Sequence, residues 1–308
     1  MVTGPTASGK TELLDSVFGR GASFFASLPS GYGSAGVVSA DSMQAYRGMD
    51  IGTAKPGQDL LSRLPHLLID ILDPDQQYTA GDFVRLADAA CAQLSARGIL
   101  PIVSGGTGFY LRSFVCGPSS APPAAQALRK AVAEDLAALG AQALRDELAK
   151  ADPGLCARIK PRDLYRLTRA VEILRATGKP PSEFAPSASP RKGYEFLIVG
   201  VERPKAELKE RIYARARSFM DKGLGREFAL LAEKGYGPES PGMKAIGYRE
   251  FFDLGGRPES EIAEAIAMNT LHYAKRQTTF LKALPGIRWI PPDASRLAEL
   301  AADFLSPP

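Results

Sequence analysis

Histidine and cysteine are scarce in this sequence. Only two histidines, His66 and His272, are present, and this number excludes a zinc site rich in histidine. The three cysteines, Cys91, Cys116 and Cys156, lie far apart, so they provide neither a metal-binding spacing nor a disulfide framework. Cysteines without such a framework are typical of a reducing compartment, and we therefore expect a cytoplasmic protein.

The sequence also lacks a signal peptide and any long apolar run without charges. We therefore expect neither secretion nor a membrane span. Of the 308 residues, 45% are apolar and 23% are charged, which is ordinary for a globular protein of one large or two modest domains. The formal net charge of +4 favours anionic partners only weakly.

Residues 4–11 read G-P-T-A-S-G-K-T and fit the pattern G-x-x-x-x-G-K-[ST] of a phosphate-binding loop. In such a loop the backbone passes close to a phosphate, and successive N–H groups point at it from the start of a helix. Residues 12–17 fit that helix, but only residues 1–3 precede the loop, so we expect a short or truncated first strand. The predicted phosphate-binding residues are Gly4, Pro5, Thr6, Ala7, Ser8, Gly9, Lys10 and Thr11.

A second polar segment follows a short buried strand that we predict at residues 37–39. Asp41 comes directly after this strand, at the edge of an open α/β sheet where ligands bind. Local sequence leaves three roles open for its carboxylate: a metal ligand, a general base, or a cap for the following turn. Residues 19–36, which lie before it, are rich in glycine and serine and predict a variable loop.

The phosphate loop and residues 39–56, S-A-D-S-M-Q-A-Y-R-G-M-D-I-G-T-A-K-P, resemble the bacterial-type tRNA dimethylallyltransferases, also called tRNA isopentenyltransferases. Residues 39–56 are the most specific part of the resemblance, because the phosphate loop alone would fit many nucleotide enzymes. Further matches follow in the family's order over nearly the whole chain. They are P-H-L-L-I-D (65–70), S-G-G-T-G-F-Y (104–110), R-L-T-R-A-V-E (166–172), K-A-I-G-Y-R (244–249) and K-R-Q-T-T-F (275–280).

The sequence departs from the family pattern at three positions. Leu67, Ala45 and Phe280 stand where the family usually has histidine, valine and tryptophan. None of these positions is assigned to the chemistry.

The resemblance implies an α/β fold and a reaction. The fold is a P-loop NTPase-like parallel sheet flanked by helices, with an all-helical insertion domain. The reaction transfers a dimethylallyl group from dimethylallyl diphosphate to N6 of the adenosine at position 37 of tRNA, beside the anticodon. The products are N6-isopentenyladenosine and diphosphate. The phosphate loop would therefore hold a prenyl diphosphate and need not bind ATP.

The same resemblance assigns roles to the catalytic residues. Asp41 would act as general base on the N6 proton. Lys10 and Arg215 would stabilise the charge on the departing diphosphate, together with a Mg²⁺ cofactor held through Thr11.

Contacts with tRNA are implied at several separate segments. The predicted tRNA-binding residues are Asp41, Ser42, Met43, Gln44, Thr107, Arg129, Tyr165, Arg166, Leu167, Thr168, Arg169, Lys244, Ala245, Ile246, Gly247, Tyr248, Arg249, Lys275, Arg276, Gln277, Thr278, Thr279, Phe280, Leu281 and Lys282.

Composition changes to proline and serine at residues 117–123, and prolines recur at residues 180–190. We therefore predict a discontinuous P-loop α/β core, residues 1–117 and 191–308, around a helical tRNA-binding insertion, residues 118–190. Apolar residues at helical spacing predict two helices in the insertion, separated at Gly140.

The end of the insertion is basic. Residues 158–192 contain nine lysines and arginines against three acids, an excess typical of a surface that follows a phosphate backbone. If Pro161 opens a helix, Arg162, Arg166 and Arg169 share one of its faces. A solvated face in which Glu172 pairs with Arg169 is the alternative.

Further segments have clear secondary-structure patterns. Residues 78–97 predict a helix, 99–103 a buried strand, 196–201 a returning strand and 261–284 a long helix. The apolar run that ends at Asp70 could close with the metal-binding carboxylate of a phosphate-loop ATPase or with a structural aspartate. We prefer the structural role, because the surrounding residues match the transferase pattern.

Three other functions remain open. A small-molecule kinase would hold ATP with Lys10 and accept a hydroxyl proton with Asp41, but it has no use for a basic insertion. An adenylate prenyltransferase would act on a free nucleotide without gripping RNA. A non-enzymatic RNA-binding module would bind tRNA without turnover. For the favoured function we expect dimethylallyl diphosphate and the tRNA anticodon stem-loop as partners, no membrane, and a monomer.

Overall fold

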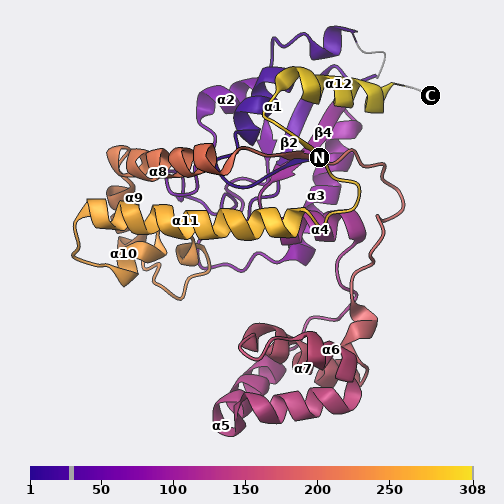
Figure 1. The fold of residues 1–308 in the computed structure, drawn as a ribbon, viewed down its shortest axis with the longest axis vertical. Coiled ribbons are helices and arrows are strands. Elements are labelled where there is room, and N and C mark those ends of the chain that lie inside the picture. Colours follow the sequence, from indigo (N-terminus) through magenta and orange to yellow (C-terminus); the bar gives the residue numbers. More distant parts are fainter. Residues whose placement is uncertain (28–30, 307–308) are drawn as a thin grey trace. The chain divides into compact units, whose positions relative to one another are not determined.

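The computed structural model describes residues 1–27 and 31–306. The chain forms two compact units, one made of residues 1–115 and 189–308 and the other of residues 116–188. We call them the core unit and the helical unit, and each is described by itself (Figure 1). In the described ranges no helix is both long enough and apolar enough to cross a membrane.

A parallel sheet forms the centre of the core unit. Its six strands lie in the order β3 (His66–Leu67), β2 (Ser34–Ser39), β4 (Ile99–Gly105), β1 (Val2–Thr3), β5 (Val199–Val201) and β6 (Arg288–Ile290). Parallel neighbours require crossover connections, and helices supply most of them here. The predicted α/β class, a P-loop NTPase-like parallel sheet flanked by helices, is confirmed.

Helices cover both faces of the sheet, as the contacts of successive residues in β2 show. Ala35 and Val37 belong to a hydrophobic cluster with α1 (Lys10–Phe18) and α12 (Ala294–Leu305). Gly36 instead faces Leu94 of α3 (Ala80–Ser95), where an added Cβ would lie 2.9 Å from the leucine. Successive side chains of a strand point to opposite faces, so α3 covers the face opposite α1 and α12.

A further helical layer of the core unit is built on α8 (Lys205–Asp221) and α11 (Glu259–Leu281), which pack against each other (Figure 1). Their buried residues form a cluster with those of α9 (Leu224–Glu233). Tyr46 and Met49 join this cluster, and both lie in the segment after Asp41. The layer therefore holds that segment against the core.

The helical unit has a hydrophobic core of its own. Val132, Leu144, Leu148, Leu167 and Val171 are buried in it. They come from α5 (Gln126–Ala151) and α7 (Leu164–Thr177), which pack closely, while α6 (Pro153–Arg158) connects them. The helical path of α5 is interrupted at Gly140, whose φ is 79°, as the sequence predicts.

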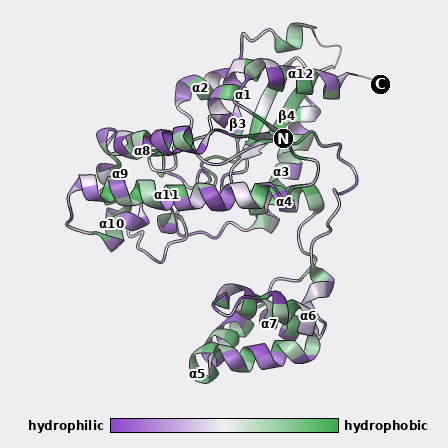
Figure 2. Ribbon diagram, in the orientation of Figure 1, coloured by the Kyte–Doolittle hydropathy of each residue, from purple (hydrophilic) through white to green (hydrophobic). Residues whose placement is uncertain are grey.

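The remaining helices are short. They are the α-helices α2 (Gln58–Arg63), α4 (Gly108–Cys116) and α10 (Arg249–Asp253), and the 3₁₀ turns Phe24–Ser27, Pro181–Phe184 and Gly242–Lys244. Figure 2 shows hydrophobic and hydrophilic residues alternating along the helices of both units, the pattern of elements with one buried face.

Several sequence predictions are confirmed with shifted ends, and three need correction. The predicted helix at 78–97 is α3, the predicted strand at 99–103 is β4, and the first strand is short. The returning strand begins at Val199, later than predicted. The predicted loop at 19–36 contains a 3₁₀ turn and the start of β2, and its residues 28–30 lie outside the described ranges.

The third correction concerns α7. Pro161 does not open this helix, because Asp163 caps it: the Asp163 carboxylate accepts the Arg166 N–H at 3.1 Å, and the helix begins at Leu164. Arg162 therefore precedes the helix and does not lie on its face.

Candidate functional site

The carboxyl ends of three neighbouring strands bring the predicted catalytic segments together. β1 ends beside β4 with Thr3 opposite Gly105, and β2 ends beside β4 with Ser39 opposite Ser104. The phosphate loop, the segment that begins at Asp41 and the turn after β4 therefore leave the sheet side by side. This is the edge at which open α/β sheets bind ligands.

The phosphate loop leads into α1 with the expected geometry. Gly9 forms the N-cap with a φ of 92°, a conformation that favours glycine, and α1 starts at Lys10. The Lys10 ammonium donates to the carbonyls of Gly4 and Pro5, both at 2.9 Å. Burial lowers the pKa of Lys10 to about 8. The loop thus carries a cation that an incoming anionic group would stabilise.

Three arginines surround the loop from α8 and the residues before it. Arg203 Nε donates to the Ser8 carbonyl at 2.7 Å, and Arg211 Nε donates to the Ala7 carbonyl at 2.9 Å. Arg215 Nη1 lies 3.5 Å from Thr6 Oγ1. Burial lowers the pKa of Arg215, although guanidinium remains charged at neutral pH. The motif could not reveal Arg203, because its place depends on the packing of α8.

Asp41 uses one of its oxygens in the local turn. Oδ1 accepts the N–H groups of Met43 at 2.9 Å and Gln44 at 3.4 Å. Burial raises the pKa of the Asp41 carboxyl, although these N–H groups and the charge of Lys10 oppose the shift. The capping role is therefore present, and the other oxygen makes no hydrogen bond within the described ranges.

The turn after β4 is tied to the Asp41 segment. The Ser42 N–H donates to Thr107 Oγ1 at 3.0 Å, and the Thr107 N–H donates to the Ala40 carbonyl at 3.2 Å. Tyr273 of α11 also contacts this turn, and burial raises the pKa of its hydroxyl to about 12. Sequence reasoning missed Tyr273, although it lies four residues before Gln277 and therefore on the same helical face.

A cavity of about 310 Å³ joins these groups. One part is polar and is lined by Thr6, Asp41, Arg215 and Tyr273. Another part is apolar and includes Ile212, Ala216, Phe219 and Ile266 from the facing sides of α8 and α11. The cavity therefore combines cationic side chains beside the phosphate loop with an apolar surface from α8 and α11.

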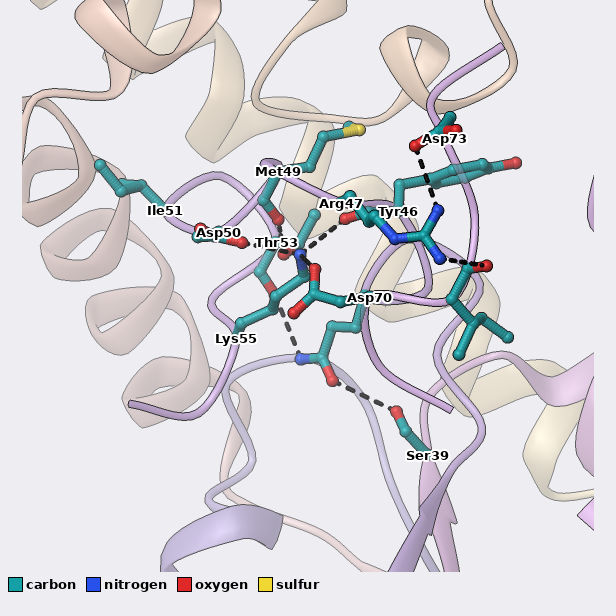
Figure 3. Close-up of polar contacts among 12 residues, drawn as sticks. Ser39, Tyr46, Arg47, Met49, Asp50, Ile51, Thr53, Lys55, Asp70 and Asp73 are labelled. Carbon is teal, nitrogen blue, oxygen red and sulfur yellow. Dashed lines mark hydrogen bonds and ion pairs between the residues drawn. The ribbon is translucent and has the colours of Figure 1, made fainter. Parts of the chain in front are cut away.

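Residues 42–56 are held in place by a network around Lys55 (Figure 3). The buried Lys55 ammonium donates to the Tyr46 carbonyl at 2.6 Å, to Asp50 at 2.7 Å and to Asp70 at 2.5 Å. Gln44 accepts from the Ser39 hydroxyl at 3.2 Å. Asp70 is therefore a partner of Lys55, in keeping with the structural role preferred from the sequence.

The predicted tRNA-binding residues fall into two groups. Five have buried side chains, namely Leu167, Ala245, Tyr248, Gln277 and Leu281. Tyr248, for example, is fully buried and donates its hydroxyl to Glu227 at 2.6 Å. Burial gives Leu167, Tyr248 and Leu281 a packing role, whereas Gln277 is buried and also lines the cavity.

The other group is accessible. Around the cavity lie Ser42, Met43, Lys244, Ile246, Arg249 and Arg276, and further along α11 Lys275, Thr279 and Lys282 are exposed. In the helical unit Arg129, Tyr165 and Arg166 are exposed, and Tyr165 is 82% accessible. These residues carry the prediction of RNA contact.

Part of the basic charge of the helical unit is paired internally. Arg169 binds Glu172 at 3.1 Å, the pairing considered as an alternative from the sequence, and Arg175 binds both Asp135 and Glu147. Arg162 has no ion pair within residues 1–27 and 31–306. Some of the basic residues near α7 are therefore neutralised by acids. The excess of exposed, unpaired cations over acids is smaller than the excess counted in residues 158–192.

These observations define a phosphate-loop α/β protein in which the loop and the half-buried Asp41 carboxylate share a cavity lined by arginines. This arrangement is suited to group transfer from a phosphorylated donor. The model of the family "IPP transferase" matches residues 44–284, more than half of the chain. The chain belongs to the IPP transferase family.

Relatives cover nearly the whole chain. The sequence is 38% identical over 309 residues to a tRNA dimethylallyltransferase of Geobacter sulfurreducens, covering 99% of this chain and 96% of the relative. The structure is similar to the full-length tRNA isopentenylpyrophosphate transferase of Bacillus halodurans, with 31% identity, a TM-score of 0.67 and coverage of 99% and 94%. A eukaryotic dimethylallyltransferase, 24% identical with coverage of 98% and 76%, shares the fold at a TM-score of 0.79.

Proposed function

We propose that this protein is a tRNA dimethylallyltransferase that transfers a dimethylallyl group from dimethylallyl diphosphate to N6 of adenosine 37, beside the anticodon. The observation that carries this proposal is that one cavity contains both Asp41, Thr6 and Arg215 and an apolar surface formed by α8 and α11. A diphosphate fits the cationic end, and a five-carbon prenyl group fits the apolar part. Names of the relatives point to the same reaction.

In the proposed reaction a C–O bond of the prenyl diphosphate breaks as a C–N bond forms to the exocyclic amine. The N–H groups of the phosphate loop, Lys10 and Arg215 stabilise the charge that develops on the leaving oxygens. The amine is a weak nucleophile because its lone pair is delocalised into the ring. The unoccupied oxygen of Asp41 accepts the N6 proton, for which the raised pKa of Asp41 makes it a stronger base.

The residues present fit a Mg²⁺ ion that would take few ligands from the protein and the rest from the diphosphate of the substrate. Thr11 supplies a hydroxyl in the first turn of α1, and the described ranges contain no group of three or more histidine, cysteine or acidic side chains that could enclose a metal. Mg²⁺ is usually bound in this way, by few protein ligands and by substrate phosphates. When bound, the ion would neutralise charge on the diphosphate.

The adenosine must leave its stack to reach Asp41, which costs a few kcal/mol, less in a loop than in a duplex. Contacts of the exposed cations on α11 and in the helical unit with the anticodon arm would offset this cost. In the helical unit the exposed Tyr165 adds an aromatic surface on which an unpaired base can stack.

The test is transfer from radiolabelled dimethylallyl diphosphate, with Mg²⁺, to unmodified tRNA or to free AMP. We expect label in tRNA only. The Asp41→Asn variant should lower kcat by about 10²–10⁴-fold and leave tRNA binding near normal, whereas the exposed Asp75→Asn should behave like wild type.

The other outcomes point to the other functions. Label in AMP would indicate a nucleotide prenyltransferase, and consumption of ATP with no label in either acceptor would indicate a kinase. Binding of tRNA without any transfer would indicate an RNA-binding module. Full activity of Asp41→Asn would show that Asp41 is not the base.

A further inference from the structure

Gln277 is buried where α11 meets both the phosphate loop and the turn after β4. Its side chain is 5% exposed. Oε1 accepts the Thr6 N–H at 2.8 Å, and Nε2 donates to the Gly106 carbonyl at 2.8 Å. One amide thus joins two segments that lie 271 and 171 residues away in the sequence.

The contact with the turn depends on glycine. A Cβ on Gly106 would lie 2.2 Å from Nε2 of Gln277, which is closer than any real side chain allows. The turn can therefore approach the amide only because residue 106 has no side chain. The neighbouring residue, Thr107, accepts a hydrogen bond from the Ser42 N–H. The turn after β4 therefore also holds the Asp41 segment.

We propose that Gln277 is a positioning residue: its amide fixes the phosphate loop relative to the turn that carries Thr107, and so sets the distance between the leaving group and the base that accepts the proton. This inference rests on the proposed transfer reaction. Gln277 acts through its hydrogen bonds to Thr6 and Gly106, and part of its side chain also lines the cavity. Misplacement of reacting groups by about 1 Å costs about 10²-fold in rate, so a loose loop would be costly.

The chemistry of the amide makes the proposal testable. A glutamine offers one donor and one acceptor in this geometry, and both are used. A protonated glutamic acid also offers one donor and one acceptor, whereas an ionised glutamate offers only acceptors and brings a negative charge beside the diphosphate site. Methionine has a similar size and offers neither function to the two backbone groups.

The experiment compares Gln277→Met and Gln277→Glu with wild type over a range of pH. We expect Gln277→Met to lower kcat by about 10–100-fold, while the Kd for tRNA, measured by filter binding without the prenyl donor, stays within about twofold of wild type. The activity of Gln277→Glu relative to wild type should be low at alkaline pH and should rise as the pH falls, because protonation restores the missing donor. Gln93→Glu, on the exposed side of α3, is the matched control and should follow wild type at every pH.

A wild-type kcat for Gln277→Met would overturn the inference. A ratio of Gln277→Glu to wild type that does not change with pH would also overturn it, because a residue that only supports folding would shift the melting temperature without this pH signature. If Gln277→Met fails to fold, the pH dependence of the activity of Gln277→Glu relative to wild type decides the question alone. Absence of transfer by the wild-type protein would instead refute the proposed function, and is recognised because it affects every variant.

Discussion

At the scale of single residues, Asp41 and Lys10 have pKa values that are shifted in ways that matter for the proposed reaction. Burial raises the pKa of Asp41, and burial lowers that of Lys10 to about 8. Asp41 acts as a base when it is ionised, and Lys10 binds a diphosphate when it is protonated. Both conditions hold together only between the two pKa values.

We therefore predict a bell-shaped pH dependence of kcat/KM for dimethylallyl diphosphate, which reports the free enzyme. The value should fall on the acidic side below the raised pKa of Asp41 and on the alkaline side above about pH 8, where Lys10 loses its proton. Steady-state kinetics across this range checks the prediction. Lys10→Arg, which keeps its charge, should lose the alkaline limb, and a wild-type profile that stays flat well above pH 8 would contradict the assignment to Lys10.

Lys55 gives a second prediction at this scale. Replacing it by methionine leaves the Tyr46 carbonyl without its partner and releases Asp50 and Asp70, which are themselves largely exposed. We expect a loss of about 1–3 kcal/mol in the free energy of unfolding, together with lower activity because the Asp41 segment is no longer held. Urea denaturation measures the change. Lys222→Met, at an exposed position, is the control, and equal stability of the two variants would refute the role of Lys55.

The residues that the sequence predicts best are those in a motif of fixed spacing. The phosphate loop and Asp41 are such residues, and the structure places them at one edge of the sheet as expected. Arg203, Tyr273 and the buried amide of Gln277 are different, because their positions depend on how α8 and α11 pack against the loop. No local pattern encodes that packing. The sequence therefore indicates the chemically active residues of the site better than the residues that hold them in place.

At the scale of elements, α7 has a packing role on one side and a predicted tRNA-binding role on the other. Leu167 is fully buried in the core of the helical unit, and Tyr165, two residues earlier, is almost fully exposed. The sequence predicts tRNA contact for both, because Tyr165 directly precedes the family motif at residues 166–172 that contains Leu167. The helical period of 3.6 residues separates them, since positions i and i+2 do not share a face.

Matched alanine variants should separate the two functions. Leu167→Ala should destabilise the helical unit by about 2–5 kcal/mol, because it removes a large buried side chain. Tyr165→Ala should leave stability unchanged and weaken tRNA binding by about 1 kcal/mol, at the low end for loss of a stacked base. Hydrogen exchange over residues 126–177 and filter binding of tRNA measure the two effects. Equal stability of the two variants, or unchanged tRNA affinity in Tyr165→Ala, would contradict this division.

The strand β3 shows where an apolar pattern misleads. The run that ends at Asp70 reads as one strand, yet only His66 and Leu67 pair with β2. Leu68 and Asp70 have φ values of 65° and 55°, and the Asp70 N–H donates to the Gln44 carbonyl. The chain thus turns away from the sheet to hold the Asp41 segment, a tertiary contact that hydrophobic periodicity cannot report.

At the scale of the whole molecule, the two substrates should differ in their response to salt. A tRNA held by exposed cations releases counterions on binding, whereas the proposed diphosphate site lies beside the half-buried Arg215 and the phosphate loop. We predict that the apparent KM for tRNA rises steeply with salt and that the KM for dimethylallyl diphosphate rises much less. Titration of each KM against KCl tests this.

Single charge removals sharpen this test. Arg166→Gln in the helical unit should make the plot of log K for tRNA against log[salt] less steep. The slope should fall by about 0.7–0.9, the value for one phosphate contact. Arg175→Gln is the control, because Arg175 is 27% exposed and paired with both Asp135 and Glu147, whereas Arg166 is 69% exposed and paired with Asp163 alone. Equal slopes for the two variants would show that α7 does not face the RNA.

The bond between Thr6 and Gln277 also has a consequence for biosynthesis. Its partners are 271 residues apart, so the ribosome completes the phosphate loop long before the helix that secures it. The central strand β1 likewise waits for β5, which is translated after the whole helical unit. The helical unit, whose core is local in sequence, can fold while the first half of the sheet still lacks its partners. A nascent chain therefore acquires its catalytic site only near the end of translation, and a chain released early has none.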